Sequence, residues 1–345
     1  FAKAQPKIAV SVPLVSRPFS WTCKLWLSDS CCRVAALTLC AGHAIASLKR
    51  HRKSRHITVL RLSGSSLTSI EYTDQVRLGG RPASLWAPGF GSQPLSCYEF
   101  TFSWGKLWRY IFGLPLGAEP ETKQLPANES VKHASSIPPS MSSRGVVLVH
   151  GLLCSRLDMA HMAEELAARG FTVIAPEMPD SISHMDGAVP GGLFGALAAR
   201  RDAEAERLEI VSEAVSWLQK RGTSSVALVG HSRGGVTVCQ MQGVFPRVTL
   251  AGFLPPSVDP QEGFHPSAAE GPMLVICGQD DEVCTRPPLS LEYVQGLVNR
   301  FTPQAQSWYP AGIGHFALLD PRVIQQWGVQ FGPFGPRTPS TAFPS

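Results

Sequence analysis

The segment Val226-Ala-Leu-Val-Gly-His-Ser-Arg-Gly-Gly235 decides the fold of this chain. Its apolar run, 226–229, predicts a buried strand, and residues 236–242 predict the start of a helix. Between them Gly230-His-Ser-Arg-Gly234 fits the pattern G-x-S-x-G. A serine on so tight a strand-to-helix turn needs glycine neighbours, because a Cβ would collide with the adjoining strand or helix. The segment therefore predicts a reactive Ser232 hydroxyl raised above the edge of a sheet.

Strands and helices alternate on both sides of this segment. Residues 145–149 are all apolar apart from a glycine, as in a strand that is buried on both faces of a parallel sheet. The alternation, with short connections, predicts an α/β fold with a doubly wound, mostly parallel sheet. The other expected strands are 84–88, 171–176, 249–254, 273–277 and 305–309, and the expected helices are 155–169, 202–220 and 289–300.

The composition divides the chain into four parts. We expect a basic, Ser-rich arm over 1–60, strands with an aromatic lead-in over 61–144, a catalytic core over 145–330, and a disordered Pro- and Gly-rich tail over 331–345. Ordered structure is expected to begin near 57–62 or 71–78.

Three segments of this chain allow specific expectations. Residues 114–144 are rich in Pro, Ser and Glu and predict a surface loop. The aromatic residues within 98–113 either pack under the sheet or line a site for an apolar substrate. The Gly-rich, apolar segment 180–200 is either a flap over the site or a simple loop.

Positive charge is concentrated at the N-terminus. The formal net charge is +5, but residues 1–61 hold eleven Lys and Arg and a single acid, a net of +10, and the remainder is net −5. The core therefore has no nucleic-acid-binding signature. Residues 34–48 are apolar and precede the basic run 49–56, which indicates organelle (plastid-like) targeting, or a weak anchor with peripheral membrane contact. The alternative is a disordered arm on a cytoplasmic protein.

The nine cysteines are scattered and odd in number. Neither the adjacent pair Cys31-Cys32 nor the pair Cys277 and Cys284 has the spacing of zinc ligands or the density of a disulfide framework. We expect free thiols in a reducing compartment, with no metal and no cofactor.

A reactive serine needs a base and an acid that orients the base. His315, in Ala311-Gly-Ile-Gly-His-Phe-Ala317, follows an expected strand in a Gly-rich loop and is the preferred base over His265. Two carboxylates compete for the acid, which in this kind of fold lies between the serine and the histidine in sequence. Asp281 follows the strand 273–277, and Asp259 follows the strand 249–254.

Backbone N–H groups are the candidate donors to an oxyanion. They belong to Leu152, in the His150-Gly-Leu turn after the strand 145–149, and to Arg233, which follows the serine. The Arg233 side chain either binds an anionic group of a ligand or forms a surface ion pair.

Taken together, the motifs at 150–151, 230–235, 278–281 and 314–315 resemble the α/β-hydrolase superfamily. The sequence is similar to platelet-activating-factor acetylhydrolases at Leu85-Trp-Ala-Pro88, 108–113 and 235–240. It is similar to chlorophyllases at Gly230-His-Ser-Arg-Gly-Gly235 and Val258-Asp-Pro-Gln-Glu-Gly263, and both of these relatives favour the Asp259 position for the acid. The turn that ends at Asp281 resembles instead the dienelactone-hydrolase and cutinase-like branch.

These resemblances imply a serine carboxylic-ester hydrolase of esterase or lipase type. Its expected partner is a small-molecule or lipid ester, including a short-acyl phospholipid. Chlorophyll and cutinase- or dienelactone-type esters are the alternatives. A non-catalytic binding protein with the same fold, and an acyltransferase that keeps the triad, are alternatives of another class.

Overall fold

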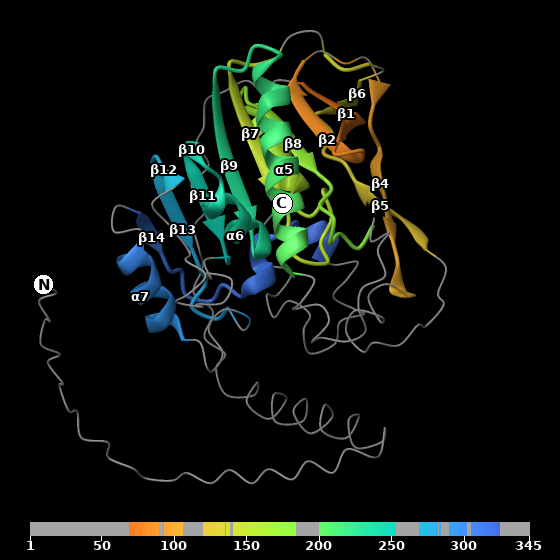
Figure 1. Cartoon of the computed structure of the whole chain (residues 1–345). Helices are drawn as coiled ribbons and strands as arrows, with labels where there is room; N and C mark the ends of the chain where they lie inside the picture. Colours follow the sequence, from red (N-terminus) through yellow and green to blue (C-terminus); the bar gives the residue numbers. More distant parts are fainter. Residues whose placement is uncertain are drawn as a thin grey trace, which may run out of the picture. The chain divides into compact units, whose positions relative to one another are not determined.

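Strand β9 (Ser225–His231), which contains the predicted apolar run, lies inside a ten-stranded sheet (Figure 1). The computed structural model describes residues 69–89, 91, 93–105, 120–134, 136–138, 141–183, 200–252, 269–281, 283, 290–301 and 305–324. They belong to one compact unit, Arg55–Ser345. In spatial order the strands are β14 (Gln306–Trp308), β13 (Met273–Ile276), β11 (Arg247–Leu250), β9, β7 (Arg144–Val149), β8 (Thr172–Pro176), β2 (Arg81–Pro88), β1 (Ile70–Leu78), β6 (Val131–His133) and β3 (Gln93–Pro94).

The six strands from β14 to β8 run parallel, whereas β2 is antiparallel to both β8 and β1. Further out, β1 pairs in parallel with β6, and β6 is antiparallel to β3. The expected mostly parallel sheet is confirmed. The register pairs Val149 with Gly230, and Leu250 with both His231 and Ile276. Because parallel strands in register end at one edge, the residues that follow β7, β9, β11 and β13 come together there.

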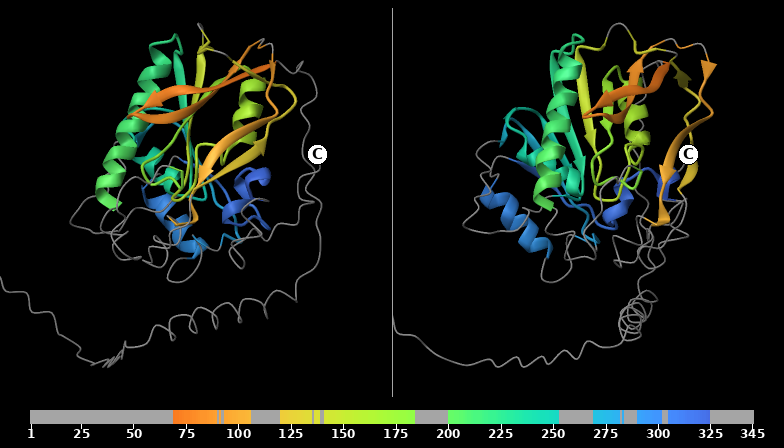
Figure 2. Two further views of the ribbon diagram at one scale, coloured as in Figure 1. Left: turned by 90° about the vertical axis from the view of Figure 1, so that its right-hand side faces the viewer. Right: turned by 45° about the vertical axis from the view of Figure 1, so that its right-hand side comes forward.

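Alternate residues of the central strands face opposite sides of the sheet. Val146 and Leu148 belong to the cluster that includes α3 (Ala160–Ala168), whereas Val147 and Val149 belong to the cluster that includes α5 (Arg200–Gln219). Figure 2 shows the two helices on either side of the sheet. Both faces are thus covered, which explains why β7 is almost wholly apolar.

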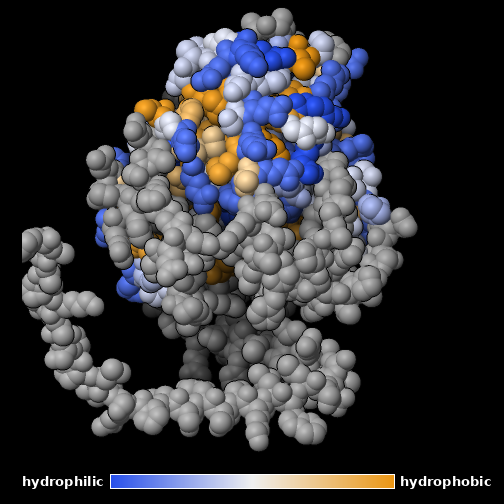
Figure 3. Space-filling view, in the orientation of Figure 1, coloured by the Kyte–Doolittle hydropathy of each residue, from blue (hydrophilic) through white to orange (hydrophobic). Residues whose placement is uncertain are grey.

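Two further helices lie on the side of α5. Helix α6 (Arg233–Gln240) contributes Val238 to the α5 cluster, and α7 (Leu291–Phe301) packs against Cys239 of α6 and Val275 of β13. Hydrophilic and hydrophobic residues alternate over the described part of the face that α5 covers (Figure 3). This mixture agrees with a helix that buries one stripe and exposes the other.

The prediction of a surface loop over 114–144 was wrong in part. Residues Glu121–Pro126 form β5, which pairs with β4 (Cys97–Phe102), and residues 131–133 form β6. Most residues of β5 are exposed, so its polar composition is that of a solvated strand. The sequence also did not predict the short two-stranded sheet in which β10 (Gly243–Val244) pairs with β12 (Ala269–Glu270).

The first core helix begins later than its sequence indicated. Ser155 does not cap it, because the Ser155 hydroxyl donates to the Asp158 carboxylate (2.7 Å) within a preceding turn. Helix α3 starts at Ala160, after Met159, and its C-terminus is followed by Gly170 with a positive φ of 86°, as expected.

The aromatic residues Tyr98, Phe100 and Phe102 point into the core from β4 and pack with Trp86 and Tyr72. For these three, packing under the sheet is confirmed. The arm 1–60, the aromatic residues 106–113, most of the proposed flap (184–199) and the tail 331–345 lie outside the described residues. In the part that is described, no helix is long and apolar enough to cross a membrane.

Candidate active site

Ser232 stands at the turn between β9 and α6. Its backbone adopts φ 53° and ψ −120°, a conformation that is strained for any residue except glycine. The Ser232 N–H donates to the carbonyl of Leu250 on β11 (2.8 Å), and the residue is only partly buried. The strained turn therefore presents the hydroxyl at the edge of the sheet, as the motif predicts.

Backbone atoms lie so close to Gly230 and Gly234 that neither position has room for a side chain. A Cβ on Gly230 would lie 2.1 Å from the carbonyl oxygen of Gly234, and a Cβ on Gly234 would lie 1.9 Å from that of Val149. Both values are far inside van der Waals contact with rigid backbone. Any larger residue would push α6 away from β7 and displace Ser232.

Three residues from distant parts of the chain meet at this edge. His315 Nε2 lies 3.0 Å from Ser232 Oγ, and His315 Nδ1 lies 3.0 Å from each carboxylate oxygen of Asp281. The structure thus brings together the serine, the preferred base and one of the two candidate acids. This is the hydrogen-bonded order in which a histidine accepts a serine proton while a carboxylate fixes the ring.

The Asp281 carboxylate is fully buried. It accepts hydrogen bonds from the Val283 N–H (3.0 Å) and, at 3.9 Å, from the Cys277 thiol. These donors orient it toward His315. The rival acid Asp259 and the rival base His265 lie outside the described residues, so the choice of Asp281 stays a prediction that the observed contact supports.

His315 begins a short 3₁₀ helix, His315–Leu318, after the Gly-rich turn. The His231 side chain holds the start of this helix in place, because the His231 Nε2–H donates a hydrogen bond to the His315 carbonyl (3.0 Å). The neutral His231 ring therefore carries its proton on Nε2, and within the described residues its buried Nδ1 has no hydrogen-bond partner. Burial, and secondarily the neighbouring His315, lowers the pKa of His231 to about 3.

The two predicted oxyanion donors belong to segments that lie next to Ser232. Arg233 is the first residue of α6, so its N–H belongs to the positive end of the helix dipole. Leu152 lies in the turn after β7, next to Gly151, on which a Cβ would be 3.0 Å from the Ser232 Cβ. Their role as donors stays a prediction.

The Arg233 side chain forms an ion pair inside the protein, not at its surface. Its guanidinium is buried and pairs with Asp180 (Nη1 to Oδ2, 2.8 Å) and with Glu204 (Nε to Oε2, 3.3 Å). An internal ion pair therefore takes the place of the expected surface ion pair.

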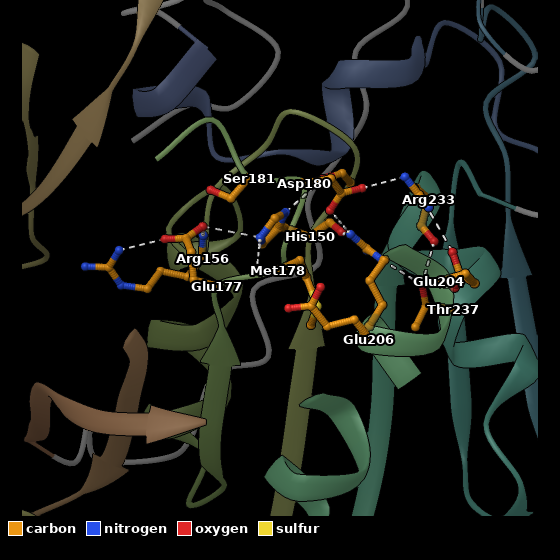
Figure 4. A network of polar contacts seen from close by, with 12 residues as sticks. His150, Arg156, Glu177, Met178, Asp180, Ser181, Glu204, Glu206, Arg233 and Thr237 are labelled. Carbon is orange, nitrogen blue, oxygen red and sulfur yellow. Dashed lines mark hydrogen bonds and ion pairs between the residues drawn. The ribbon is translucent and has the colours of Figure 1, made fainter. Parts of the chain in front are cut away.

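These contacts belong to a larger buried polar network at the same edge (Figure 4). Sequence reasoning missed it, although two signals were available. Asp180 follows β8 just as Asp281 follows β13, and Arg207 shares the apolar stripe of α5 with Val211, Ala214 and Leu218. A charged residue on a buried stripe needs a buried partner. The other charged or polar members are His150, Arg156, Glu177, Glu204 and Thr237.

Among the described residues, no group of three or more His, Cys, Asp or Glu side chains is arranged to hold a metal ion. Cys97, Cys154, Cys239 and Cys277, the cysteines in that part of the chain, are free thiols.

The model of the "Alpha/beta hydrolase family" matches residues 146–327, just over half of the chain. No curated protein matches the chain in sequence. The match covers β7 through the segment after His315, which is the part that carries all three residues of the site.

Two solved structures show the level of structural similarity. A dienelactone hydrolase-like promiscuous phosphotriesterase from metagenomic libraries has 17% identity and a TM-score of 0.43, over 79% of this chain and 89% of that one. A ferulic acid esterase from Streptomyces cinnamoneus has 19% identity and a TM-score of 0.44, over 78% and 79% respectively. Similarity at this level assigns neither a substrate nor a residue role.

The buried His231 allows a prediction about titration. Because its folded pKa is about 3 and an unfolded histidine titrates near 6.5, the free energy of unfolding should fall as the pH drops below about 6.5. In the folded protein the His231 ring should show no protonation shift by NMR between pH 8 and about pH 4.5. In urea the same ring should titrate normally, whereas a folded-state midpoint near 6.5 would contradict the assignment.

Proposed function

Because the chain belongs to the alpha/beta hydrolase family, we propose that it is a serine carboxylic-ester hydrolase. One observation carries the proposal, the chain of contacts from Ser232 Oγ through His315 to Asp281, each 3.0 Å long. A serine hydroxyl is a weak nucleophile until a neighbouring base accepts its proton. Family membership and this geometry together favour acyl transfer from an ester.

In the proposed reaction the Ser232 oxygen attacks the ester carbonyl while His315 Nε2 takes the hydroxyl proton. The imidazolium then donates that proton to the departing alcohol, which leaves an acyl-serine. A water molecule, deprotonated by His315, attacks the acyl carbon and releases the acid, and Ser232 regains its proton. Asp281 stays ionised and stabilises the imidazolium, while the N–H groups of Leu152 and Arg233 hold the oxyanion in both steps.

We further propose a lipid-like or otherwise apolar ester with a small or medium acyl group, such as a short-acyl phospholipid. Support comes from the sequence resemblances and from partly buried apolar side chains on the loops that carry the site, namely Leu152, Leu153 and Phe316. Tyr98, Phe100 and Phe102 are buried in the core, so these three residues do not support an apolar substrate site. Chlorophyllase-like and cutinase- or dienelactone-hydrolase-like activities are the alternatives.

Two alternatives of another class start from the same fold. A binding protein without catalysis would not need a serine, a histidine and a carboxylate in contact, so the site argues against it. An acyltransferase would use the same acyl-serine and an alcohol or amine in place of water.

A fluorophosphonate probe tests the nucleophile, because it reacts only with a serine that a neighbouring base activates. The folded protein should be labelled once, at Ser232, and Ser232→Ala should abolish the label. Ser225→Ala is a matched control, since Ser225 is an exposed serine at the start of the same strand. Labelling that survives in Ser232→Ala would overturn the proposed nucleophile, and a wild-type protein without any label would favour the binding protein.

Substituting each candidate acid by asparagine tests which carboxylate orients the His315 ring. An amide at position 281 would hold the His315 ring in the wrong tautomer, so Asp281→Asn should lower kcat by about 10⁴-fold. Asp259→Asn and Asp280→Asn, the latter at an exposed neighbour, should keep kcat within a few-fold of the wild-type value. A large loss in Asp259→Asn alone would transfer the role to that carboxylate.

A panel of esters tests the substrate class. We expect higher kcat/KM for acetyl to hexanoyl esters on apolar alcohols and for short-acyl phospholipids than for long-acyl phospholipids. Preferred turnover of chlorophyll would instead support the chlorophyllase-like alternative. Ester turnover measured with and without an added alcohol or amine acceptor separates hydrolysis from acyl transfer. If the wild-type protein turned over none of these esters, the proposed ester hydrolase activity would be contradicted.

A further inference from the structure

The two predicted oxyanion donors belong to segments that are distant in sequence. Leu152 lies in the turn after β7, and Arg233 begins α6. An oxyanion site works only if its donors are fixed before the charge develops. The relative position of these N–H groups must therefore be held by contacts between the segments.

Asp180 contacts the turn that carries Leu152 on both sides of that residue. Its backbone carbonyl accepts the Leu153 N–H (3.1 Å), where Leu153 is held at a positive φ of 56°. Its carboxylate Oδ1 accepts a hydrogen bond from Arg207 Nη1, and Arg207 Nη2 donates to the His150 carbonyl (2.6 Å). Leu152 thus lies between two residues that Asp180 holds, one directly and one through Arg207.

The same carboxylate also holds the start of α6. Its second oxygen, Oδ2, accepts from Arg233 Nη1 (2.8 Å), and Glu204 on α5 accepts from Arg233 Nε. Figure 4 shows Asp180 between His150 and Arg233, with Glu204 and Thr237 beyond them.

We propose that Asp180 is a positioning residue that sets the separation of the Leu152 and Arg233 N–H groups and so preorganises the oxyanion site. The inference rests on the proposed function, because it assigns a role within the same reaction. Asp180, Arg207 and Arg233 are all buried. Burial alone would raise the pKa of Asp180, but the two guanidinium groups hold it below its usual value, so the carboxylate stays ionised and bridges both.

The test compares Asp180→Asn with Glu164→Gln, a matched loss of charge elsewhere. Glu164 is a buried carboxylate on α3 that accepts from Tyr98 Oη (2.8 Å) and Arg322 Nη2 (3.0 Å). Both variants lose an ion pair inside the protein, so both should be destabilised. Only Asp180→Asn should disturb the oxyanion donors.

For Asp180→Asn we expect kcat to fall about 10- to 100-fold with KM within threefold, less than the roughly 10²- to 10³-fold effect of deleting a donor. Affinity for a boronic acid, whose negatively charged tetrahedral adduct with Ser232 places a boronate oxygen at this site, should fall by a similar factor. Glu164→Gln should leave kcat and boronate affinity unchanged at a temperature where both variants are folded. An equal change in the two variants, or no change in kcat for Asp180→Asn, would overturn the inference.

A second variant, Arg207→Lys, covers the case in which Asp180→Asn does not fold. Lysine keeps a cation beside Asp180 but cannot donate at once to Asp180, Thr237 and the His150 carbonyl. It should show the same loss of kcat and of boronate affinity, and an unchanged kcat would contradict the proposed role. Failure of the proposed function is distinguishable, because the wild-type protein itself would then lack ester turnover and fluorophosphonate labelling.

Discussion

The structure depends on close packing of backbone against backbone at one end of the sheet. Helix α6 approaches β7 so closely that a Cβ on Gly234 would lie 1.9 Å from the Val149 carbonyl oxygen, and the residue between strand and helix adopts a strained conformation. Strain of this kind costs on the order of 1–3 kcal/mol and persists only if its surroundings fix it. Here the pairing of β9 with β7 and β11 fixes it, because Ser232 continues a strand that is hydrogen-bonded on both sides.

The same edge contains a dense group of buried charges. Asp180 pairs with Arg207 and Arg233, and Glu177 pairs with Arg156 and lies 3.3 Å from His150. Removing such groups from water costs several kcal/mol per ion, so they contribute little net stability by themselves. They do fix directions, since each charged group accepts or donates to several partners in one arrangement. Through these contacts the loops that follow β7 and β8 are connected to α5 and to the start of α6.

The N-terminal strands support the site without contributing reactive groups to it. Tyr72, Trp86 and Tyr98 form an aromatic cluster on the α3 side of the sheet, in which Trp86 Nε1 donates to Tyr98 Oη and Tyr98 Oη donates to Glu164. Their polar atoms are satisfied inside the protein. The contacts between Ser232, His315 and Asp281 come instead from the segments that follow β9, β13 and β14.

The spacing of apolar residues and the positions of glycines predicted the parallel sheet, its main helices and the tight turn at Ser232. These features follow from local sterics and from the burial of apolar runs. The sequence also predicted His315 as the base, from its order and Gly-rich context, but it left Asp281 and Asp259 as alternative acids. Only the tertiary structure showed that Asp281 contacts the imidazole, how the polar strand β5 pairs, and that Arg233 lies in an internal ion pair with Asp180. Contacts of this kind join residues tens of positions apart, and their distances are set by strand register and helix packing, which no local pattern encodes.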